Sequence, residues 1–418
     1  MPASILRLSI CFVLLACLAG CGGSSGSGKP TTVTYTFTGP APTAVATQIG
    51  SGAYTQATLA SGQLTLSVPS GETNFSIAYL CPSPTAGPFI YTEYINQAST
   101  LDDTAFSEMC NPKAVLGGMA TVQVNAAAIP GAEDIDVGSG GGCSACDTFN
   151  GSAFLADGTY DLPIYVTGAG GLYANTLAAK ILRNQTIPGT LNGGAPVVFQ
   201  TADETVPQAL AYSNVPNGYS PNGGNVTYYT ADGTFVPLAL WTLPVATQYM
   251  AMPSGAYQSG DYYEFSVEAS NPSGSESTSI VRYTTSGDPQ TFNFPASFLY
   301  AGPAAAALPT FNFTYSGFNG MPNVSQQAAI FWGVGTWPGG GIAADLDSIT
   351  MSATAHYQNG SPTMTVPDLS SLTGFLAPAS TGTTVVWTAG FSQGDPFLAS
   401  TPSGSIQSVS NSGSFTAP

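Results

Sequence analysis

The chain is a succession of short runs in which apolar and polar residues alternate, and turns containing glycine separate these runs. In residues 68–80 (VPSGETNFSIAYL), a turn at Gly71 leads into a run that places Phe75, Ile77 and Tyr79 on one face. A period of two is the pattern of a β-strand with one buried face. The same turn and run recur in three further stretches, 155–166 (LADGTYDLPIYV), 252–269 (MPSGAYQSGDYYEFSVEA) and 377–389 (APASTGTTVVWTA).

This pattern predicts an all-β protein, in which only residues 171–185 (GLYANTLAAKILRNQ) are ambiguous between helix and strand. The glycines of the four turns are 87, 97 and 127 residues apart, which are the sizes of single β-sandwich domains. An alternative to four domains is that the two middle ones form one larger sandwich. We predict tandem immunoglobulin-like β-sandwich domains at residues 31–118, 119–200, 201–300 and 301–418.

The repeated turn and strand resemble a strand of transthyretin-like (carboxypeptidase-regulatory-like) and fibronectin type III modules. In those modules a turn of the form P-x-G-x-Y leads into a core strand near the end of a sandwich. The resemblance covers about a dozen residues in each copy, and it implies the fold alone.

The N-terminus predicts export. Arg7 precedes an apolar run, 8–19 (LSICFVLLACLA), which is too short to span a bilayer as a stable helix. The run ends in Leu18-Ala19-Gly20-Cys21, which resembles the lipobox of bacterial lipoproteins. That resemblance implies a signal peptide at 1–20, acylation of Cys21, and a Gly/Ser tether at 21–30. Because Gly22 rather than Asp follows the cysteine, the outer membrane is the expected destination, with the lipid as the link to the membrane.

The charge composition of the chain disfavours polyanionic ligands. Only 7% of the residues are charged and the formal net charge is −17. After removal of Arg7, the bases are Lys29, Lys113, Lys180, Arg183 and Arg282, which do not cluster in the sequence. A nucleic-acid partner needs clustered Lys and Arg, so we expect none.

The cysteines fit an oxidising compartment. Three of the seven cysteines lie at or before Cys21. The other four are Cys81, Cys110, Cys143 and Cys146, an even number that predicts two disulfides. Four cysteines allow three pairings, of which we favour Cys81–Cys110 with Cys143–Cys146. The Cys143-Ser-Ala-Cys146 spacing also occurs in redox and zinc motifs. A redox motif needs a βαβ context and a zinc site needs a second pair of closely spaced cysteines, and the sequence has neither.

The candidates for catalysis are few. The single histidine, His356, lies in an alternating run that places Ile349, Met351 and Ala353 on one face and His356 on the other. We therefore interpret His356 as a solvent-facing strand residue beside the turn at Asn359-Gly360. No nucleophile motif occurs outside the tether, so we predict no catalytic residue and no cofactor.

Two groups of carboxylates, Glu133-Asp134-Ile135-Asp136 and Asp345-Leu346-Asp347, lie in or beside glycine-rich stretches. Acids so closely spaced can bind Ca²⁺, but neither string matches an EF-hand, and solvated loop charge is the simpler interpretation, so no metal site is predicted.

The segment 329–341 (AIFWGVGTWPGGG) supplies the one candidate ligand site. Alternation assigns Trp332 to the core and leaves Trp337 at a strand end, where it could stack on a sugar ring beside Asp345 and Asp347. The other interpretation is that Trp337 covers the rim of a sandwich. We expect a non-enzymatic protein of the cell envelope with a binding, adhesion or structural role and a glycan or protein ligand. The alternatives are a glycan-active hydrolase with paired carboxylates and a subunit of an envelope assembly.

Overall fold

A computed structural model of the chain describes residues 29–38, 41–81, 89–110, 118–138, 141–168, 176–241, 246–318, 321, 323–334, 345–359, 361–394, 397–398, 401–402 and 404–418. Strands dominate these residues and pack as layered sheets, which confirms the prediction of an all-β sandwich fold. In the described part of the chain, no helix is long and apolar enough to cross a membrane.

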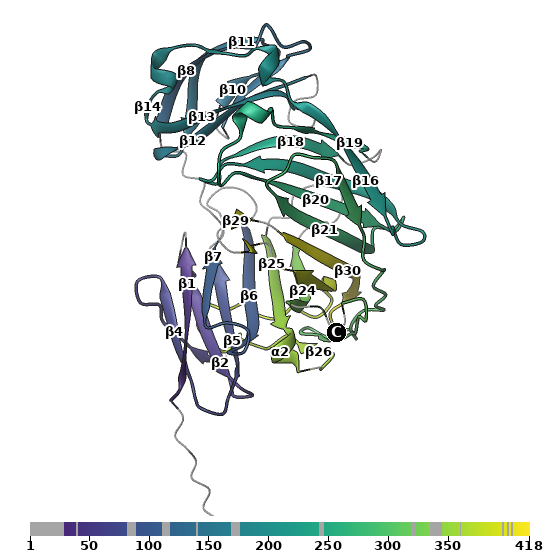
Figure 1. Ribbon diagram of the computed structural model, residues 1–418. Helices are drawn as coiled ribbons and strands as arrows, with labels where there is room; N and C mark the ends of the chain where they lie inside the picture. Colours follow the sequence, from purple (N-terminus) through teal and green to yellow (C-terminus); the bar gives the residue numbers. More distant parts are fainter. Residues whose placement is uncertain are drawn as a thin grey trace, which may run out of the picture.

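A twelve-stranded sheet runs through the molecule (Figure 1). Its neighbouring strands are antiparallel, except for one parallel pair near the middle in which Asp347 lies opposite Tyr91. The order is β18 (Phe235–Trp241), β17 (Ser220–Tyr229), β20 (Tyr262–Ser270), β21 (Glu276–Thr284), β30 (Gly404–Thr416), β27 (Thr384–Gly394), β24 (Val324–Val334), β25 (Asp345–Thr354), β6 (Phe89–Ser99), β5 (Asn74–Cys81), β2 (Ala44–Ile49) and β3 (Thr55–Gln56).

Two three-stranded sheets pack on the ends of the long sheet, because the inner faces of both layers carry alternating apolar side chains. One buries Val33, Tyr35 and Phe75 in a shared core, and the other buries Tyr249, Phe265 and Phe292. They are formed by β4 (Gln63–Val68), β1 (Thr31–Thr38) and β7 (Ala105–Met109), and by β19 (Gln248–Ala251), β16 (Val206–Ser213) and β22 (Gln290–Asn293).

A separate sandwich, at the top of Figure 1, is built from residues 118–198. Its core includes Val122, Ile135, Leu155 and Ile164. One sheet contains β10 (Gly141–Cys143), β9 (Asp134–Val137), β12 (Gly158–Thr167) and β13 (Thr176–Ile187), and the other contains β11 (Thr148–Leu155), β8 (Gly118–Asn125), β14 (Gly189–Thr190) and β15 (Val197–Val198).

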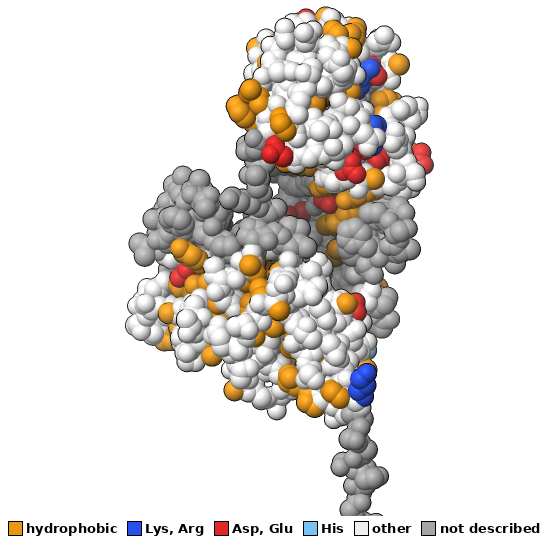
Figure 2. All heavy atoms as spheres, turned by 90° about the vertical axis from the view of Figure 1, so that its left-hand side faces the viewer, with side chains coloured by type: hydrophobic (Ala, Val, Ile, Leu, Met, Phe, Trp, Pro, Cys, Tyr) orange, Lys and Arg blue, Asp and Glu red, His pale blue; other side chains and the backbone are white. Residues whose placement is uncertain are grey.

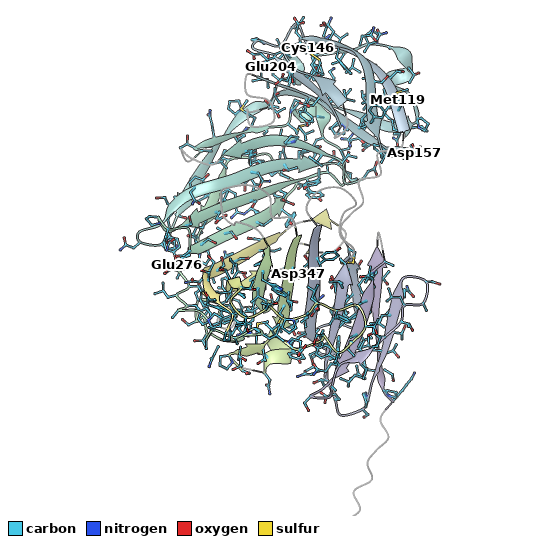
Figure 3. The ribbon with its side chains drawn as sticks, turned by 180° about the vertical axis from the view of Figure 1, so that it is seen from behind. Met119, Cys146, Asp157, Glu204, Glu276 and Asp347 are labelled. Atoms are coloured by element: carbon cyan, nitrogen blue, oxygen red, sulfur yellow. A yellow bond between two sulfur atoms is a disulfide. The ribbon has the colours of Figure 1, made fainter. Side chains whose placement is uncertain are left out.

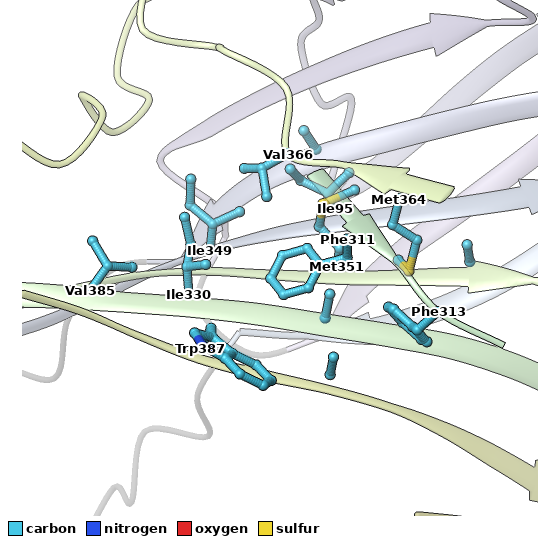
Figure 4. Close-up of a cluster of buried hydrophobic side chains, with 14 of the residues drawn as sticks. Ile95, Phe311, Phe313, Ile330, Ile349, Met351, Met364, Val366, Val385 and Trp387 are labelled. Carbon is cyan, nitrogen blue, oxygen red and sulfur yellow. The ribbon is translucent and has the colours of Figure 1, made fainter. Parts of the chain in front are cut away.

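The fourth core covers the middle of the long sheet (Figure 4). Ile330, Ile349 and Trp387 on the sheet meet Phe311 and Met364 from segments that cross it. The remaining short elements are β23 (Thr310–Asn312), β26 (Thr363–Thr365), β28 (Phe397–Leu398), β29 (Thr401–Pro402), α2 (Ala355–Gln358), η2 (Leu191–Gly194), η3 (Thr201–Asp203) and η4 (Ser254–Ala256).

Two local expectations are settled by this fold. The stretch that was ambiguous between helix and strand enters β13, so its described part is a strand. The strand placement of His356 is wrong. The strand β25 ends at Thr354, whose side chain accepts a hydrogen bond from the backbone N–H of Tyr357 and thereby caps the one-turn helix α2. Asn359 then ends the helix in the left-handed conformation, and His356 is exposed as expected.

The long sheet takes strands from three of the four predicted domains, those at 31–118, 201–300 and 301–418. Its strand β30 pairs with β21, so that Asn411 lies opposite Glu276. Whether the four segments fold independently stays a prediction.

Candidate functional site

A groove lies where the upper sandwich meets the end of the long sheet. One wall is formed by β9, β10 and β12, and the other by β17 and β18. The cavity between them has a volume of about 720 Å³. A second hollow of about 320 Å³ adjoins it, and Gly138 and Phe235 line both. Together they form a concave site with two chemically different walls.

Strand alternation on β9 makes the first wall acidic. Ile135 and Val137 point into the core of the upper sandwich, so Asp134 and Asp136 line the groove. The Oδ1 atom of Asp134 accepts a hydrogen bond of 2.9 Å from the N–H of Ala145. The carboxylate of Asp136 forms no hydrogen bond or ion pair with a described residue, although its backbone pairs with β10 and β12. Burial, and then the negative charge of Asp134, raise the pKa of Asp136 to about 6.

Tyr165 forms the floor beside Asp136. It lies directly opposite Asp136 in the pairing of β12 with β9, and only 4% of its surface is exposed. Its ring packs with the core of the long sheet's end, while no described residue hydrogen-bonds to its hydroxyl. Burial and the neighbouring Asp136 raise the pKa of Tyr165. The hydroxyl is therefore a neutral donor available to a ligand.

The second wall is mainly apolar. Phe235, Pro237 and Ala239 alternate along β18, and Leu240 adds to their surface. Phe235 and Leu240 are 44% and 41% exposed, which is high for large apolar side chains. The polar contribution of this wall comes from Asn225 and Thr227 on β17.

A row of aromatic rings continues this wall across the outer face of the sheet. Phe235 contacts Tyr229 with ring centroids 5.9 Å apart, and Tyr229 stacks on Tyr262 at 5.1 Å. Tyr262 contacts Tyr283 at 6.1 Å. The row runs over β17, β20 and β21, and of its four rings only Phe235 lines the groove.

Glycine lets β10 form the rim of the groove. A Cβ atom on Gly142 would collide with the backbone carbonyl oxygen of Ile135, so only glycine permits this approach of β10 to β9. In the described part of the glycine-rich stretch after Asp136, glycine is therefore required for β10 to pack against β9 and form the rim.

An ion cluster around Arg183 holds the two walls together. A bulge in the pairing of β12 with β13 sets Arg183 and Asn184 opposite Asp161 and aims the guanidinium toward the long sheet. Its Nη1 lies 2.7 Å from Asp161, and its Nη2 lies 2.6 Å from Asp261, which is fully buried. In the sequence Arg183 is one base among five and its role cannot be recognised, because its partners lie 22 and 78 residues away.

The hairpin between β17 and β18 strengthens the junction. Its Asp232 accepts a hydrogen bond of 2.9 Å from the N–H of Asp161, and its Thr234 hydroxyl donates to the carbonyl oxygen of Asp161 at 2.6 Å. The groove therefore lies between two sheets that are tied by charge and by hydrogen bonds.

The structure places some of the residues that the sequence singles out and leaves others outside its described part. The favoured cysteine pairing is confirmed, with Cα atoms 5.2 Å apart for Cys81–Cys110 and 6.1 Å apart for Cys143–Cys146. Trp332 is buried as expected. The Cys21 and Trp337 positions lie outside the described residues.

The second acidic pair lies apart from the groove. Asp345 begins β25, and Asp347 is partly buried on the same strand, next to Trp332 of β24. Figure 3 shows Asp347 well separated from Cys146, which lies near the acidic wall through a hydrogen bond to the carbonyl oxygen of Glu133. The two acidic strings of the sequence therefore do not form a common site.

Within the described ranges, no three His, Cys, Asp or Glu side chains are grouped so that they could hold a metal ion. His356 instead lies 2.5 Å from Asp102 at the surface, where Nδ1 meets Oδ1. Figure 2 shows sparse basic side chains on the face that it presents, with acidic side chains gathered in its upper part.

No protein-family model matches the chain, and no curated protein matches it.

Proposed function

We propose that this protein is a lipid-anchored binding protein of the bacterial cell envelope, and that the groove between the upper sandwich and the long sheet is its ligand site. The export signal, the lipobox and the tether support the location. The groove supports the role, because ligand sites are typically concave, largely apolar and provided with a few polar groups that orient the ligand.

The observation that carries this proposal is the pairing of two unlike walls across one cavity. Asp134 and Asp136 offer oxygen acceptors on one side, and Phe235 and Leu240 offer apolar contact on the other. Leaving large apolar side chains exposed beside the partly buried carboxylate of Asp136, which has no partner among the described residues, gives no stability, so a ligand that covers both is the simplest explanation.

The test is a screen of the full chain against cell-envelope glycans and peptides, followed by two matched variants. Phe235→Ala removes an exposed ring from the groove, whereas Phe154→Ala removes an exposed ring from β11 that lines neither hollow. Binding that is lost with Phe235→Ala and kept with Phe154→Ala supports the proposal. Equal effects of the two substitutions contradict it.

A second candidate function is glycan hydrolysis. The pair Asp134 and Asp136 favours it, because glycosidases use two carboxyl groups of which the general acid has a raised pKa, and the pKa of Asp136 is raised to about 6. Release of reducing sugar from envelope glycans, abolished by Asp136→Asn, would establish this function. Binding without turnover would exclude it for the glycans tested.

A further inference from the structure

The groove is rich in hydrogen-bond acceptors and poor in donors. Its acidic wall presents Asp134 and Asp136, and no lysine or arginine is among the residues that line it. The described side-chain donors are few: the hydroxyl groups of Tyr165, Ser144 and Thr227, and the amide of Asn225, which donates to Thr227 at 3.3 Å. A ligand that only donates hydrogen bonds fits this wall better than one that needs donors and acceptors in equal number.

Asp136 and Tyr165 show that the wall is incomplete without a ligand. The carboxylate of Asp136 is partly buried and has no hydrogen-bond partner among described residues, although burial of a charge is costly unless it is paired. Tyr165 is almost fully buried, yet its hydroxyl also has no described partner. Both groups line the cavity on directly opposed positions of β9 and β12.

The opposite wall suits an aliphatic stem. Phe235, Pro237, Ala239 and Leu240 line the cavity with apolar side chains, on the wall other than that of the carboxylates. Lysine and arginine carry a charged head on a chain of methylene groups, so they can place the head near Asp136 while the stem covers this surface.

The aromatic row argues against a sugar platform. A sugar ring stacks on the open face of an aromatic ring, but Tyr229 and Tyr262 stack on each other with an angle of 13° between their planes. The two ring faces that meet are therefore closed to a sugar, and the ring edges remain for flanking residues of an extended chain.

We propose that the groove binds a basic peptide, with the ammonium or guanidinium head of one side chain between Asp134, Asp136 and Tyr165 and its stem on the apolar wall of β18. This proposal rests on the proposed function, since it names the ligand class of the same site. The net charge of −17 would draw such a peptide toward the protein and would make binding weaken with salt.

The experiment is a titration of the full chain, purified in detergent, with an acetylated and amidated hexapeptide of alternating alanine and lysine. The controls are the same peptide with acetylated lysine side chains, and a chitin oligosaccharide as a neutral glycan. Two variants each remove one negative charge: Asp136→Asn inside the groove, and Asp157→Asn, an exposed carboxylate that lines neither hollow. The melting temperature of each variant is measured alongside.

We expect the lysine peptide to bind, the acetylated peptide to bind at least about tenfold more weakly, and Asp136→Asn to cause a loss of similar size. Asp157→Asn should change the affinity by less than about twofold, because the charge of an exposed carboxylate that lines neither hollow is screened by solvent. Equal binding of the two peptides, or equal effects of the two variants at unchanged melting temperature, would overturn the proposal.

The glycan arm separates this inference from the proposed function. If the oligosaccharide binds, if Phe235→Ala abolishes its binding, and if the lysine peptide does not bind, then the ligand class is wrong and the groove is still the site. If ligands from the wider screen bind and no groove substitution affects them, both proposals fail.

Discussion

The guanidinium of Arg183 lies 2.6 Å from the carboxylate of Asp261 and joins the upper sandwich to the long sheet, beside the core to which Tyr165 and Ala179 of the upper sandwich contribute. Asp261 also accepts hydrogen bonds from the hydroxyl of Tyr228 and from the N–H groups of Ala231 and Gln258. The side chain of Asp261 is fully buried, so its charge depends on these partners. This pair fixes the position of the acidic wall of the groove relative to the apolar wall.

Arg183→Met should therefore destabilise the protein strongly. The variant keeps most of the stem but leaves Asp261 as a buried charge without its cation, which typically costs about 3–5 kcal/mol. Lys180→Met is the matched control on the same strand, because Lys180 pairs with Asp203 in a partly exposed position where a salt bridge contributes about 0–1 kcal/mol. Urea unfolding of both variants measures the difference. A similar loss in the free energy of unfolding for the two variants would contradict the claim that Arg183 compensates a buried charge on Asp261.

The same pair predicts a pH dependence. Burial alone would raise the pKa of Asp261, but the hydrogen bonds from Arg183, Tyr228 and Gln258 outweigh burial and hold the pKa below its usual value. Because the unfolded pKa is about 3.9, the stabilisation is complete above that pH and is lost as the pH falls through the folded pKa.

Arg183→Met should reverse this sign, since burial without the cation raises the pKa of Asp261. The penalty is then largest at neutral pH and shrinks as acid protonates the carboxyl group. We expect the difference in melting temperature between wild type and Arg183→Met to narrow from pH 7 to about pH 5. A difference that widens over this interval would contradict the assignment.

The two disulfides should contribute unequally to stability. Cys81–Cys110 closes a loop with a sequence separation of 29, and Cys143–Cys146 one with a separation of 3. Loop entropy gives about 3.5 kcal/mol for the first and about 2 kcal/mol for the second. Denaturant unfolding of the two double-alanine variants measures these losses, and peptide mapping without reduction checks the pairing. Free thiols at all four positions would also argue against export.

Lipidation depends on Cys21. Cys21→Ala should abolish incorporation of labelled fatty acid and release the protein from the membrane fraction, because the tether then carries no anchor. If the variant fractionates with membranes as the wild type does, the lipobox interpretation is wrong.

The fold class and much of the local structure followed from the sequence. Alternation correctly placed Ile349 and Met351 in the core of β25, and local spacing identified both disulfides. The face on which a strand residue lies and the pairing of nearby cysteines both depend on residues close in the chain, so the sequence pattern predicts them directly. The pattern failed at His356, where the hydroxyl of Thr354 caps a turn of helix that alternation does not reveal.

The strand order of the long sheet and the position of the groove could not be predicted from local sequence patterns. The pairing of β21 with β30 joins residues more than a hundred positions apart, and nothing in either strand identifies its partner. Asp136 and Phe235 line one cavity although about a hundred residues separate them. In the sequence Glu133–Asp136 is only a string of closely spaced acids. The fold makes Asp136 part of a cavity, because Ile135 points into the core and Tyr165 lies opposite Asp136.

The central claim is that the cavity between β9 and β18 is where the ligand binds. Hydrogen–deuterium exchange of the full chain, with and without a saturating amount of the lysine hexapeptide, tests it most directly. We predict slower exchange at residues 134–138, 141–143 and 235–240, and no change in β27 and β24 at the middle of the long sheet. Protection confined to strands outside the groove, with the groove unaffected under saturation, would contradict the account.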